Sequence, residues 1–432
     1  MTQNVPLITT TLGSLIDSGD AELQTGPFGT MLNASEYVPT GTPVVAVQNI
    51  GENRFIESDF VYVDDSTSER LAKYRLLEGD IIFGRKGAVD RRVLIRKNEV
   101  GWIQGSDCIR LRLSQKIDAE FLSYQLGNPF IKQWITANAN GATMPSLNQE
   151  ILSRLPLSLP PLPIQRRIAD ILSAYDDLIE NNQRQIKLLE EAAMRLYREW
   201  FVFMRFPGHE SVRIVDGVPE GWERVTVADC LSMSINGGWG KENPERSYQI
   251  PGKVIRGTDI NDVKSGIVFS IPSRFHTEKD VISRRLSKWD IVFELSNGNI
   301  DNIGRTLLVD SYVLDVGGEN LICASFCKLL RPLSPEIAIQ LYLQINEMQE
   351  NGLLSVYKKN GSNGINNFDF DNFLSHDFVV TNNTSYITPI MTIMDKITNL
   401  RKELVLLIKS RDALLPRLMN GGEGLKLEGG AV

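Results

Sequence analysis

The sequence predicts an α+β protein in which two mostly-β domains follow one another and each is followed by a long helix. Two observations lead to this fold class: two long segments have the heptad spacing of packed helices, and several motifs occur once in each half. A chain of 432 residues is too long for one ordinary domain. The expected boundaries are 1–160 for the first domain, 161–206 for the first long helix, 207–386 for the second domain, 387–421 for the second long helix and 422–432 for a flexible tail.

The first long helix is expected after the proline-rich junction at residues 160–163, because neither Gly nor Pro then occurs until Pro207. Its apolar residues recur at alternating spacings of four and three, which predicts a heptad seam with one stutter at Asn182. The seam consists of Ile164, Ile168, Ile171, Tyr175, Leu178, Asn182, Ile186, Leu189, Ala193, Leu196 and Trp200.

The second long helix has the same design, with Thr388 as the expected N-cap and Pro389 at the first helical position. A seam this long needs a partner helix of similar length, and the chain offers only the other long helix. We therefore expect the two helices to pack against each other in antiparallel orientation. The second seam consists of Ile390, Ile393, Ile397, Leu400, Leu404, Leu407, Arg411, Leu414 and Leu418.

The two halves repeat several short motifs. The segment 77–87 (LEGDIIFGRKG) corresponds to 287–298 (SKWDIVFELSNG), and each half carries a polar, glycine-containing loop before its long helix, at Gly141 and at Gly361. Short β-branched runs between Gly and Asn turns predict a mostly antiparallel sheet in each half. Strands are expected at 44–47, 80–83, 92–96 and 108–113, and internal helices at 118–136 and 335–351.

Composition limits the class of protein. The net charge is −7 and the pI is about 5.3, which argues against coating nucleic acid by bulk electrostatics, although local basic patches remain possible. The N-terminus lacks the pattern of a secretory signal, and no stretch is long and apolar enough to span a bilayer, so we expect a cytoplasmic protein. The four cysteines and three histidines show no spacing typical of a metal site, and packing or surface roles are favoured for all of them.

Catalytic motifs are weak throughout. Asn128-Pro129-Phe130 lacks the second proline of an adenine methyltransferase motif, and we interpret it as a helix-breaking turn from which Phe130 packs inward. Asp262-Val263-Lys264 is an isolated Asp-x-Lys in a loop and not a nuclease site. The Gly-Lys pairs at 240–241 and 252–253 do not continue as a Walker A motif. The sequence thus predicts a protein without an enzymatic activity of its own.

Residues 155–172 (LPLSLPPLPIQRRIADIL) and 411–421 (RDALLPRLMNG) resemble the specificity subunit of type I restriction-modification systems. The order of two domains and two long helices resembles that family as well, so the resemblance covers nearly the whole chain. Two departures concern the junctions: the family commonly has Glu-Gln where this chain has Ile164-Gln165, and the second junction at 386–390 lacks the double proline.

The resemblance implies a non-catalytic DNA-binding subunit that binds a bipartite target in double-stranded DNA. Each domain would act as a target-recognition domain for one half of the target, and the helices would set the gap between the halves. It also implies docking of two modification (methyltransferase) subunits and allows for two restriction (motor and nuclease) subunits. No cofactor is expected in this chain, whereas the partners would bind S-adenosylmethionine, or ATP and Mg.

Base recognition in the major groove requires Arg or Lys for guanine and Asn or Gln for adenine, on loops that reach base edges. Such side chains lie at matched points of the two halves, although any single one of them is also typical of a solvated turn. The expected DNA contacts are Arg85, Lys86, Arg91, Arg92, Thr143, Ser146 and Asn148 in the first half, and Asn297, Asn299, Asn302, Arg305, Lys358, Lys359, Ser362 and Asn363 in the second.

A second hypothesis comes from a different class of protein. The acidic balance is also compatible with a non-catalytic scaffold that binds other proteins through the paired helices. A sequence preference in DNA binding, tested together with a methyltransferase, would distinguish the two hypotheses.

Overall fold

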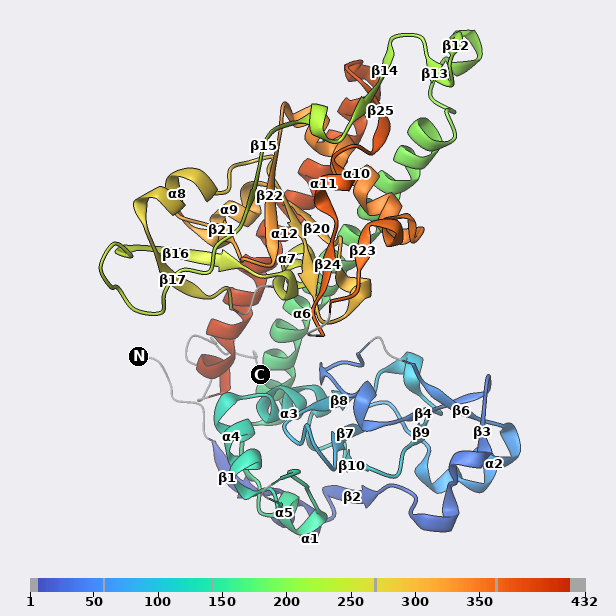
Figure 1. Cartoon of the computed structure of the whole chain (residues 1–432). Helices are drawn as coiled ribbons and strands as arrows, with labels where there is room; N and C mark the ends of the chain where they lie inside the picture. The colour runs from blue at the N-terminus through green and yellow to red at the C-terminus, as the bar shows by residue number, and fades with distance from the viewer. Residues whose placement is uncertain (1–6, 57–58, 142, 268–269, 362–363, 420–432) are drawn as a thin grey trace, which may run out of the picture. The chain divides into compact units, whose positions relative to one another are not determined.

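A computed structural model describes residues 7–56, 59–141, 143–267, 270–361 and 364–419, so the expected tail at 422–432 lies outside it. The contacts within the chain define two units, formed by residues 1–177 with 409–432 and by residues 178–408. Two long helices, α6 (Leu162–Tyr197) and α12 (Thr384–Met419), each contribute a segment to both units (Figure 1). The α+β fold class with two β-rich halves is confirmed.

The first unit is built on a five-stranded sheet in the order β2-β10-β7-β8-β5. Its neighbouring strands are antiparallel, except that β5 runs parallel to β8. A four-stranded sheet, β3-β6-β4-β9, and the antiparallel pair β1-β11 lie in the same unit. The strands are β1 Ile8–Thr11, β2 Ala21–Thr25, β3 Tyr37–Val38, β4 Thr42–Val45, β5 Glu52–Asn53, β6 Val61–Val63, β7 Ile81–Gly84, β8 Arg92–Leu94, β9 Ile103–Gln104, β10 Cys108–Leu113 and β11 Pro156–Leu159.

The helices of the first unit correct two expectations. The segment 118–136 forms two helices, because Pro129 cannot donate the backbone hydrogen bond that a continuous helix needs and Asn128 caps the second helix by accepting from the amide of Phe130. Phe130 is 66% exposed, so the inward packing expected for it is wrong. The short helices are α1 Leu12–Asp17, α2 Asp65–Arg70, α3 Ala119–Leu126, α4 Pro129–Asn138 and α5 Gln149–Ser153.

The second unit has a four-stranded antiparallel sheet in the order β15-β22-β18-β20 and a three-stranded sheet, β17-β16-β21. Smaller sheets are β14-β25, β19-β24-β23 and β12-β13. The strands are β12 Ile214–Val215, β13 Val218–Pro219, β14 Trp222–Thr226, β15 Leu231–Asn236, β16 Ile250–Ile255, β17 Ser273–His276, β18 Ile291–Glu294, β19 Ser296–Asn297, β20 Thr306–Leu308, β21 Ile322–Cys323, β22 Cys327–Pro332, β23 Lys358–Lys359, β24 Asn366–Phe368 and β25 Asp377–Thr381.

The helix expected at 335–351 is confirmed as α10, which begins at Pro335, is capped by the Ser334 side chain and ends at Glu350. Pro at the first helical position costs nothing there, because that amide has no partner within the helix. The other short helices of this unit are α7 Ile260–Lys264, α8 Glu278–Arg284, α9 Ser311–Gly317 and α11 Phe370–Phe373.

The topologies of the two units match. The order β10-β7-β8 in the first corresponds to β22-β18-β20 in the second, and both units pair their first long strand with the strand that precedes a long helix, as β1-β11 and β14-β25. Each also contains one parallel pair outside the main sheet, β4-β9 and β16-β21. The sequence repeats therefore correspond to a structural duplication.

The long helices pack against each other in antiparallel orientation, as expected. In the second unit, Arg401 of α12 pairs with Glu190 of α6 at 2.6 Å, and the rings of Tyr386 and Trp200 lie 6.1 Å apart. Residue numbers rise along α12 from 386 to 401, whereas those of the contacting residues fall from Trp200 to Glu190, so the two segments run in opposite directions. In the first unit, α12 contacts α6 through a 2.8 Å ion pair between Arg411 and Asp176.

Two details of the helices differ from the sequence-based expectations. Leu178 is 47% exposed and Ile179 is buried, so the stutter lies between Tyr175 and Ile179 and not at Asn182. Helix α12 begins at Thr384, where the side chain of Asn383 accepts from the amide of Ser385. Thr388 and Pro389 therefore lie inside the helix and not at its start. The first error arose because Leu178 and Ile179 are adjacent and both apolar. The second arose because Asn383 and Thr388 can both cap a helix.

Candidate nucleic-acid interface

The first unit brings its two expected DNA-contacting loops together. The amide of Gly87 donates to the carbonyl of Pro145 at 2.9 Å, and the amide of Leu147 donates to the carbonyl of Arg85 at 2.8 Å. Lys86 and Ser146 form an antiparallel bridge. We call residues 85–91 and 140–148 the first loop pair. Its hydrogen bonds run between backbone atoms, so its side chains can vary without loss of the connection.

The side chains of the first loop pair form a basic cluster. Arg85 lies over the ring of Phe28, with 4.8 Å from its guanidinium carbon to the ring centroid. Arg85 and Lys86 both pair with Asp107, at 3.4 and 3.3 Å. The Lys86 side chain is 46% exposed, so this ion pair is solvated and weak and can be exchanged for a phosphate or a base. Thr143, Asn148 and Arg91 are exposed, and Ser146 is half-buried.

Arg92 does not belong to this surface, which corrects the expectation for it. It is 4% exposed, its Nε donates to the carbonyl of Ser123, and its Nη1 lies 3.5 Å from a carboxylate oxygen of Glu52. Burial lowers the pKa of Arg92 to about 10, against the opposing effect of Glu52. A Cβ at Gly127 would lie 2.3 Å from its guanidinium, so the chain is shaped around this side chain. Arg92 stabilises the fold and is not available to DNA.

The second unit joins its two loops in the same way. Strand β19 pairs with β24, and β24 pairs with β23, so the segment 296–305 lies beside residues 358–361 and 364–368. The amide of Phe368 donates to the carbonyl of Leu295 at 2.9 Å, as Leu147 does to Arg85 in the first unit. We call these segments the second loop pair. Ser362 and Asn363 lie outside the described residues, so the structure does not place these two expected contacts.

The asparagines of the second loop pair differ in accessibility. Asn297 is held by its neighbours, because its Nδ2 donates to Glu294 at 2.7 Å and its Oδ1 accepts from the amide of Asn299 at 2.8 Å. Asn302 also approaches the Asn297 Oδ1, at 3.5 Å, and is half-buried. Asn299 is exposed. Of the three, Asn299 is therefore the one most open to a ligand.

The expected cations of the second loop pair also differ. Arg305 is 17% exposed and donates from Nε to Glu294 at 2.7 Å, so its main contact is internal. Lys359 pairs with Asp369 at 2.6 Å but remains 67% exposed. Lys358 is half-buried, and burial lowers its pKa, opposed by Asp301. Only Lys359 in this set is a freely accessible charge.

Sequence reasoning missed an exposed aromatic residue in each unit. Phe28 is 50% exposed and Trp239 is 38% exposed, and each follows a glycine whose amide donates to the main sheet: Gly26 to Cys108 at 3.0 Å and Gly237 to Cys327 at 2.9 Å. The available signal was a glycine followed two residues later by an aromatic residue, just after a strand in both halves. Arg85 covers Phe28, and Arg274 lies over Trp239 at 4.6 Å. Aromatic rings beside guanidinium groups are typical of nucleic-acid surfaces, as they are of ordinary cation-π pairs.

A groove of about 500 Å³ lies beside the second loop pair. Its lining combines exposed apolar side chains with a few polar ones. The lining residues are Trp239, Arg256, Gly257, Thr258, Glu294, Ser296, Asn297, Gly298, Ala324, Ser325, Phe326 and Ile365.

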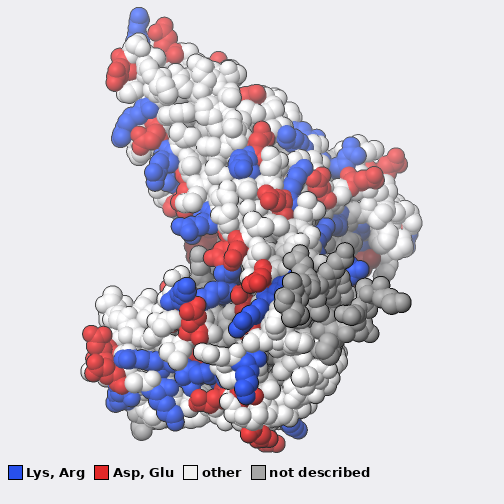
Figure 2. All heavy atoms as spheres, turned by 180° about the vertical axis from the view of Figure 1, so that it is seen from behind, with Lys and Arg blue, Asp and Glu red and all other residues white. Residues whose placement is uncertain are grey.

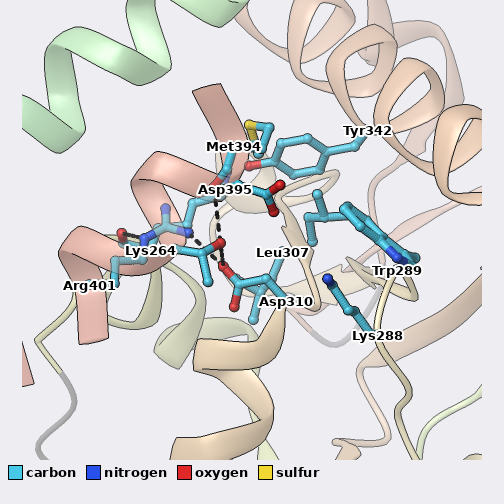
Figure 3. A pocket seen from close by; sticks show the side chains of 11 residues that line it. Lys264, Lys288, Trp289, Leu307, Asp310, Tyr342, Met394, Asp395 and Arg401 are labelled. Atoms are coloured by element: carbon cyan, nitrogen blue, oxygen red, sulfur yellow. Dashed lines mark hydrogen bonds and ion pairs between the residues drawn. The ribbon is translucent and has the colours of Figure 1, made fainter. Parts of the chain in front are cut away.

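A second cavity of the same unit is not a ligand site. It lies where α12 packs on the sheet (Figure 3) and holds only about 20 Å³, room for about one water molecule. Arg401 contacts Glu190 at 2.6 Å and the carbonyl of Lys264 at 2.6 Å, and Thr398 donates to Asp310 at 2.7 Å. The contact with Glu190 connects α12 to α6, and the contacts with Lys264 and Asp310 connect α12 to the β-rich part of the unit.

Charge is mixed on the molecular surface. Figure 2 shows Lys and Arg side chains interspersed with Asp and Glu over both units, with a group of neighbouring basic side chains on the first unit. The four cysteines are buried free thiols, and the described residues contain no group of three or more His, Cys, Asp or Glu that could bind a metal ion. A search of the described helices found none with the length and apolar character of a membrane span.

Comparison with known proteins places these features in context. Residues 28–191 match the family described as Type I restriction modification DNA specificity domain. The chain is 24% identical over 328 residues to the Type I restriction enzyme MjaIX specificity subunit of Methanocaldococcus jannaschii, a match that covers 70% of this chain and 68% of that protein. It is 25% identical over 208 residues to the MjaVIII specificity subunit of the same organism, covering 46% of this chain and 47% of that protein.

The fold is similar to that of the type I restriction-modification system S subunit from M. genitalium in its crystal structure. The TM-score is 0.59 at 15% sequence identity, and the match covers 97% of each chain. The likeness therefore extends over both halves and both long helices.

Proposed function

Because the chain belongs to the family of specificity subunits of type I restriction-modification systems, which recognise DNA target sequences without a catalytic site of their own, we propose that its two units read two separate parts of one target. The first loop pair would contact one part and the second loop pair the other. The gap between the two parts would be set by α6 and α12.

One observation carries this proposal: equivalent backbone hydrogen bonds hold chemically different side chains in the two units. Leu147 donates to Arg85 and Phe368 to Leu295, so both loop pairs have the same frame. On that frame the first pair presents Arg85 and Lys86, whereas the second presents asparagine amides and Lys359 beside the carboxylate of Glu294. A repeated frame with altered chemistry is what a protein needs in order to read two different half-targets.

The exposed polar side chains of the two loop pairs, together with the half-buried Ser146 and Lys358, are the proposed DNA contacts. Lys86 and Arg91 suit guanine or phosphate, and Asn299 suits adenine. Thr143, Ser146, Asn148, Lys358 and Lys359 supply further hydrogen bonds or phosphate contacts. Arg92 is excluded by its burial, and Arg305 and Asn302 act inside the protein.

The proposed partners follow from the family. Two methyltransferase subunits would bind S-adenosylmethionine and modify the DNA, and two motor and nuclease subunits would bring ATP and Mg chemistry. The long helices are the proposed docking surface for the methyltransferase. This division of labour accounts for a specificity subunit that carries no catalytic group.

Mapping of modified adenines tests the proposal. The chain is produced together with its partner methyltransferase in a host that lacks other modification systems, and the genome is sequenced for methylated adenines. A two-part motif with a fixed gap is expected. Lys86→Ala with Arg91→Ala should relax only one half of that motif, and Asn299→Ala only the other.

The controls separate recognition from folding. Lys116→Ala removes an exposed cation that pairs with Asp20 outside both loop pairs and both long helices, and should leave the motif unchanged. Modification without any sequence preference would contradict the proposal and favour a protein-binding scaffold. Loss of both half-motifs in a variant of one loop pair would contradict the assignment of one half to each unit.

A further inference from the structure

The groove beside the second loop pair has an unusual composition. Its walls include Trp239, Phe326 and Ile365, which are 38%, 56% and 40% exposed. Its buried side includes one carboxylate, Glu294, which is 2% exposed. Burying a carboxylate costs free energy unless hydrogen bonds compensate it, so its presence beside an apolar groove points to a role in binding.

Glu294 is held in a fixed orientation. Its Oε1 accepts from Asn297 Nδ2 at 2.7 Å, and its Oε2 accepts from Arg305 Nε at 2.7 Å. An ionised carboxylate has about four lone-pair sites, so each oxygen can still accept from a ligand. Neither neighbour competes for that capacity, because each makes one hydrogen bond to the group.

The chain makes room for this carboxylate through a glycine. A Cβ at Gly257 would lie 1.9 Å from Glu294 Oε1, so any other residue there would displace the carboxylate from its hydrogen bonds. The equivalent residues of the first unit are Val47 and Gly84: the turns Val47–Asn49 and Gly257–Asp259 correspond, and Gly84 pairs with Cys108 as Glu294 pairs with Cys327. A Cβ at Gly84 would lie 3.2 Å from Val47. The two units therefore exchange large and small residues across the same contact.

The exchange changes the chemistry of recognition. Near Gly84 the first unit presents the donors Arg85 and Lys86, whereas the second unit presents the acceptor Glu294. In the major groove, guanine offers the acceptors N7 and O6, while only cytosine N4 and adenine N6 are donors. A carboxylate can therefore accept from cytosine or adenine and repels the acceptors of guanine and thymine.

We propose that this groove is a base-reading site for the second part of the target and that Glu294 determines specificity by accepting a hydrogen bond from an exocyclic amino group in the major groove. The apolar walls exclude water from that hydrogen bond and strengthen it. Arg256, whose side chain is 40% exposed on the rim, is placed to contact a phosphate. This inference rests on the proposed function and names the residue that distinguishes the second site from the first.

Base analogues test the inference with the wild-type complex. The chain with its partner methyltransferase is titrated against duplexes that carry the mapped motif, in which one adenine is replaced by purine or one cytosine by 2-pyrimidinone. Each analogue removes only the amino group. At one position of the second part, affinity should fall about tenfold to a hundredfold. The analogue that causes the loss identifies the base as adenine or cytosine.

The variant Glu294→Leu tests the same hydrogen bond from the protein side, because leucine has no acceptor. It should abolish the sensitivity to the amino group at that position and relax the methylation motif there, with the other part unchanged. Asp290→Asn is the control, because Asp290 is a buried carboxylate just before the same strand and pairs with Arg331 outside the groove. It should lower the yield of complex without altering the motif.

Failure of the proposed function and failure of the inference about Glu294 give different results. If wild-type complex yields no two-part motif, the proposed function is wrong. If the motif exists but no amino deletion in its second part weakens binding, the inference about Glu294 is wrong while the proposed function stands. If Glu294→Leu prevents assembly of the complex, the base-analogue titration still decides, because it needs no variant.

Discussion

Arg112 donates from Nε and Nη2 to the two carboxylate oxygens of Asp80, with both distances at 2.7 Å. The second unit contains the same pair, in which Arg331 donates to Asp290 at 2.8 and 2.7 Å. Each carboxylate also accepts from a backbone amide three residues earlier, Leu77 or Ser287, at 2.7 Å. The pair thus fixes the turn that enters the central strand of each main sheet.

Asp80→Asn should destabilise the first unit. The carboxylate is buried and accepts three hydrogen bonds, and the amide would turn one donor toward another donor. We expect the free energy of unfolding to fall by about 3 kcal/mol, measured by denaturant titration. Asp177→Asn is the control, because Asp177 is 74% exposed in its pair with Arg54 and should cost less than about 1 kcal/mol. Equal effects of the two substitutions would contradict the structural role of Asp80.

Gln340→Ala should destabilise the second unit. The side chain of Gln340 is buried, accepts from the amide of Thr381 at 2.9 Å and donates to its carbonyl at 3.1 Å. Gln125 makes the same reciprocal contacts with Ser158 in the first unit. Removal leaves two buried backbone groups without partners, so the free energy of unfolding should fall by about 3 kcal/mol.

Gln249→Ala is the control for that substitution. Gln249 is exposed and donates only locally, to the carbonyl of Arg246, so its removal should change the free energy of unfolding by less than about 0.5 kcal/mol. Thermal and denaturant unfolding of both variants would check the difference. A stable Gln340→Ala protein would show that the last strand does not depend on this side chain.

Lys86→Ala and Arg92→Ala should have opposite consequences, although both residues were expected to contact DNA. Lys86→Ala should weaken DNA binding and lower the slope of log affinity against log salt by about one, with little effect on stability. Arg92→Ala should lower the free energy of unfolding by about 3 kcal/mol, because the buried carbonyl of Ser123 loses its donor and Glu52 keeps only its pair with Lys132. Salt-dependent titrations and unfolding curves of both variants measure these effects. An Arg92→Ala protein that is stable but weak in DNA binding would contradict the structural role.

His276 should make the second unit less stable in mild acid. The residue is 1% exposed, and burial lowers its pKa, with Asp280 raising it and Arg284 lowering it further. The unfolded chain, with a pKa of about 6.5, then takes up a proton that the folded state does not. The contribution is present above about pH 6.5 and is lost as the pH falls toward the lower folded value.

A pH comparison checks this sign. Between pH 7.5 and 5.5 the His276 contribution should cost no more than about 1.4 kcal/mol. His276→Gln should reduce the acid-dependent loss of stability relative to wild type. His376 also has a pKa lowered by burial, so part of the loss should remain in the variant. A variant with the same pH dependence as wild type would contradict the assignment to His276.

The sequence was sufficient for features that depend on periodicity and repetition. Heptad spacing predicted both long helices, and matched motifs predicted two loop pairs. It was insufficient where two neighbouring residues of the same type differ in burial. Arg91 and Arg92 are adjacent in sequence, yet Arg91, just before strand β8, is exposed, whereas Arg92, the first residue of the strand, is buried. Arg92 is buried because it donates to the carbonyl of Ser123, a residue distant in sequence.

The same limit explains the missed groove. Glu294 and Gly257 are 37 positions apart by number, and nothing local marks them as neighbours. Its meaning comes from the corresponding contact of the first unit, where Val47 is the large residue and Gly84 the small one. Residue types in loops predict the kind of chemistry, whereas long-range packing decides which side chains reach a ligand.

The helices offer a test of how the gap in the target is set. Helix α6 crosses from the first unit to the second between Asp177 and Leu178, and α12 crosses between Ile408 and Lys409. Each unit has its own contact between the helices, Asp176 with Arg411 in the first and Glu190 with Arg401 in the second. Inserting residues into one helix alone would disturb one of these contacts, so matched insertions at both crossings are required.

Four residues added at each crossing lengthen each helix by about 6 Å, close to two base-pair steps of B-DNA. If the helices act as a spacer, the methylation motif should keep both half-targets and gain about two base pairs between them, measured by mapping modified adenines. Insertion in α6 alone is the control and should lower activity without producing a new fixed gap. An active double-insertion protein with an unchanged gap would show that the spacing is set elsewhere in the complex.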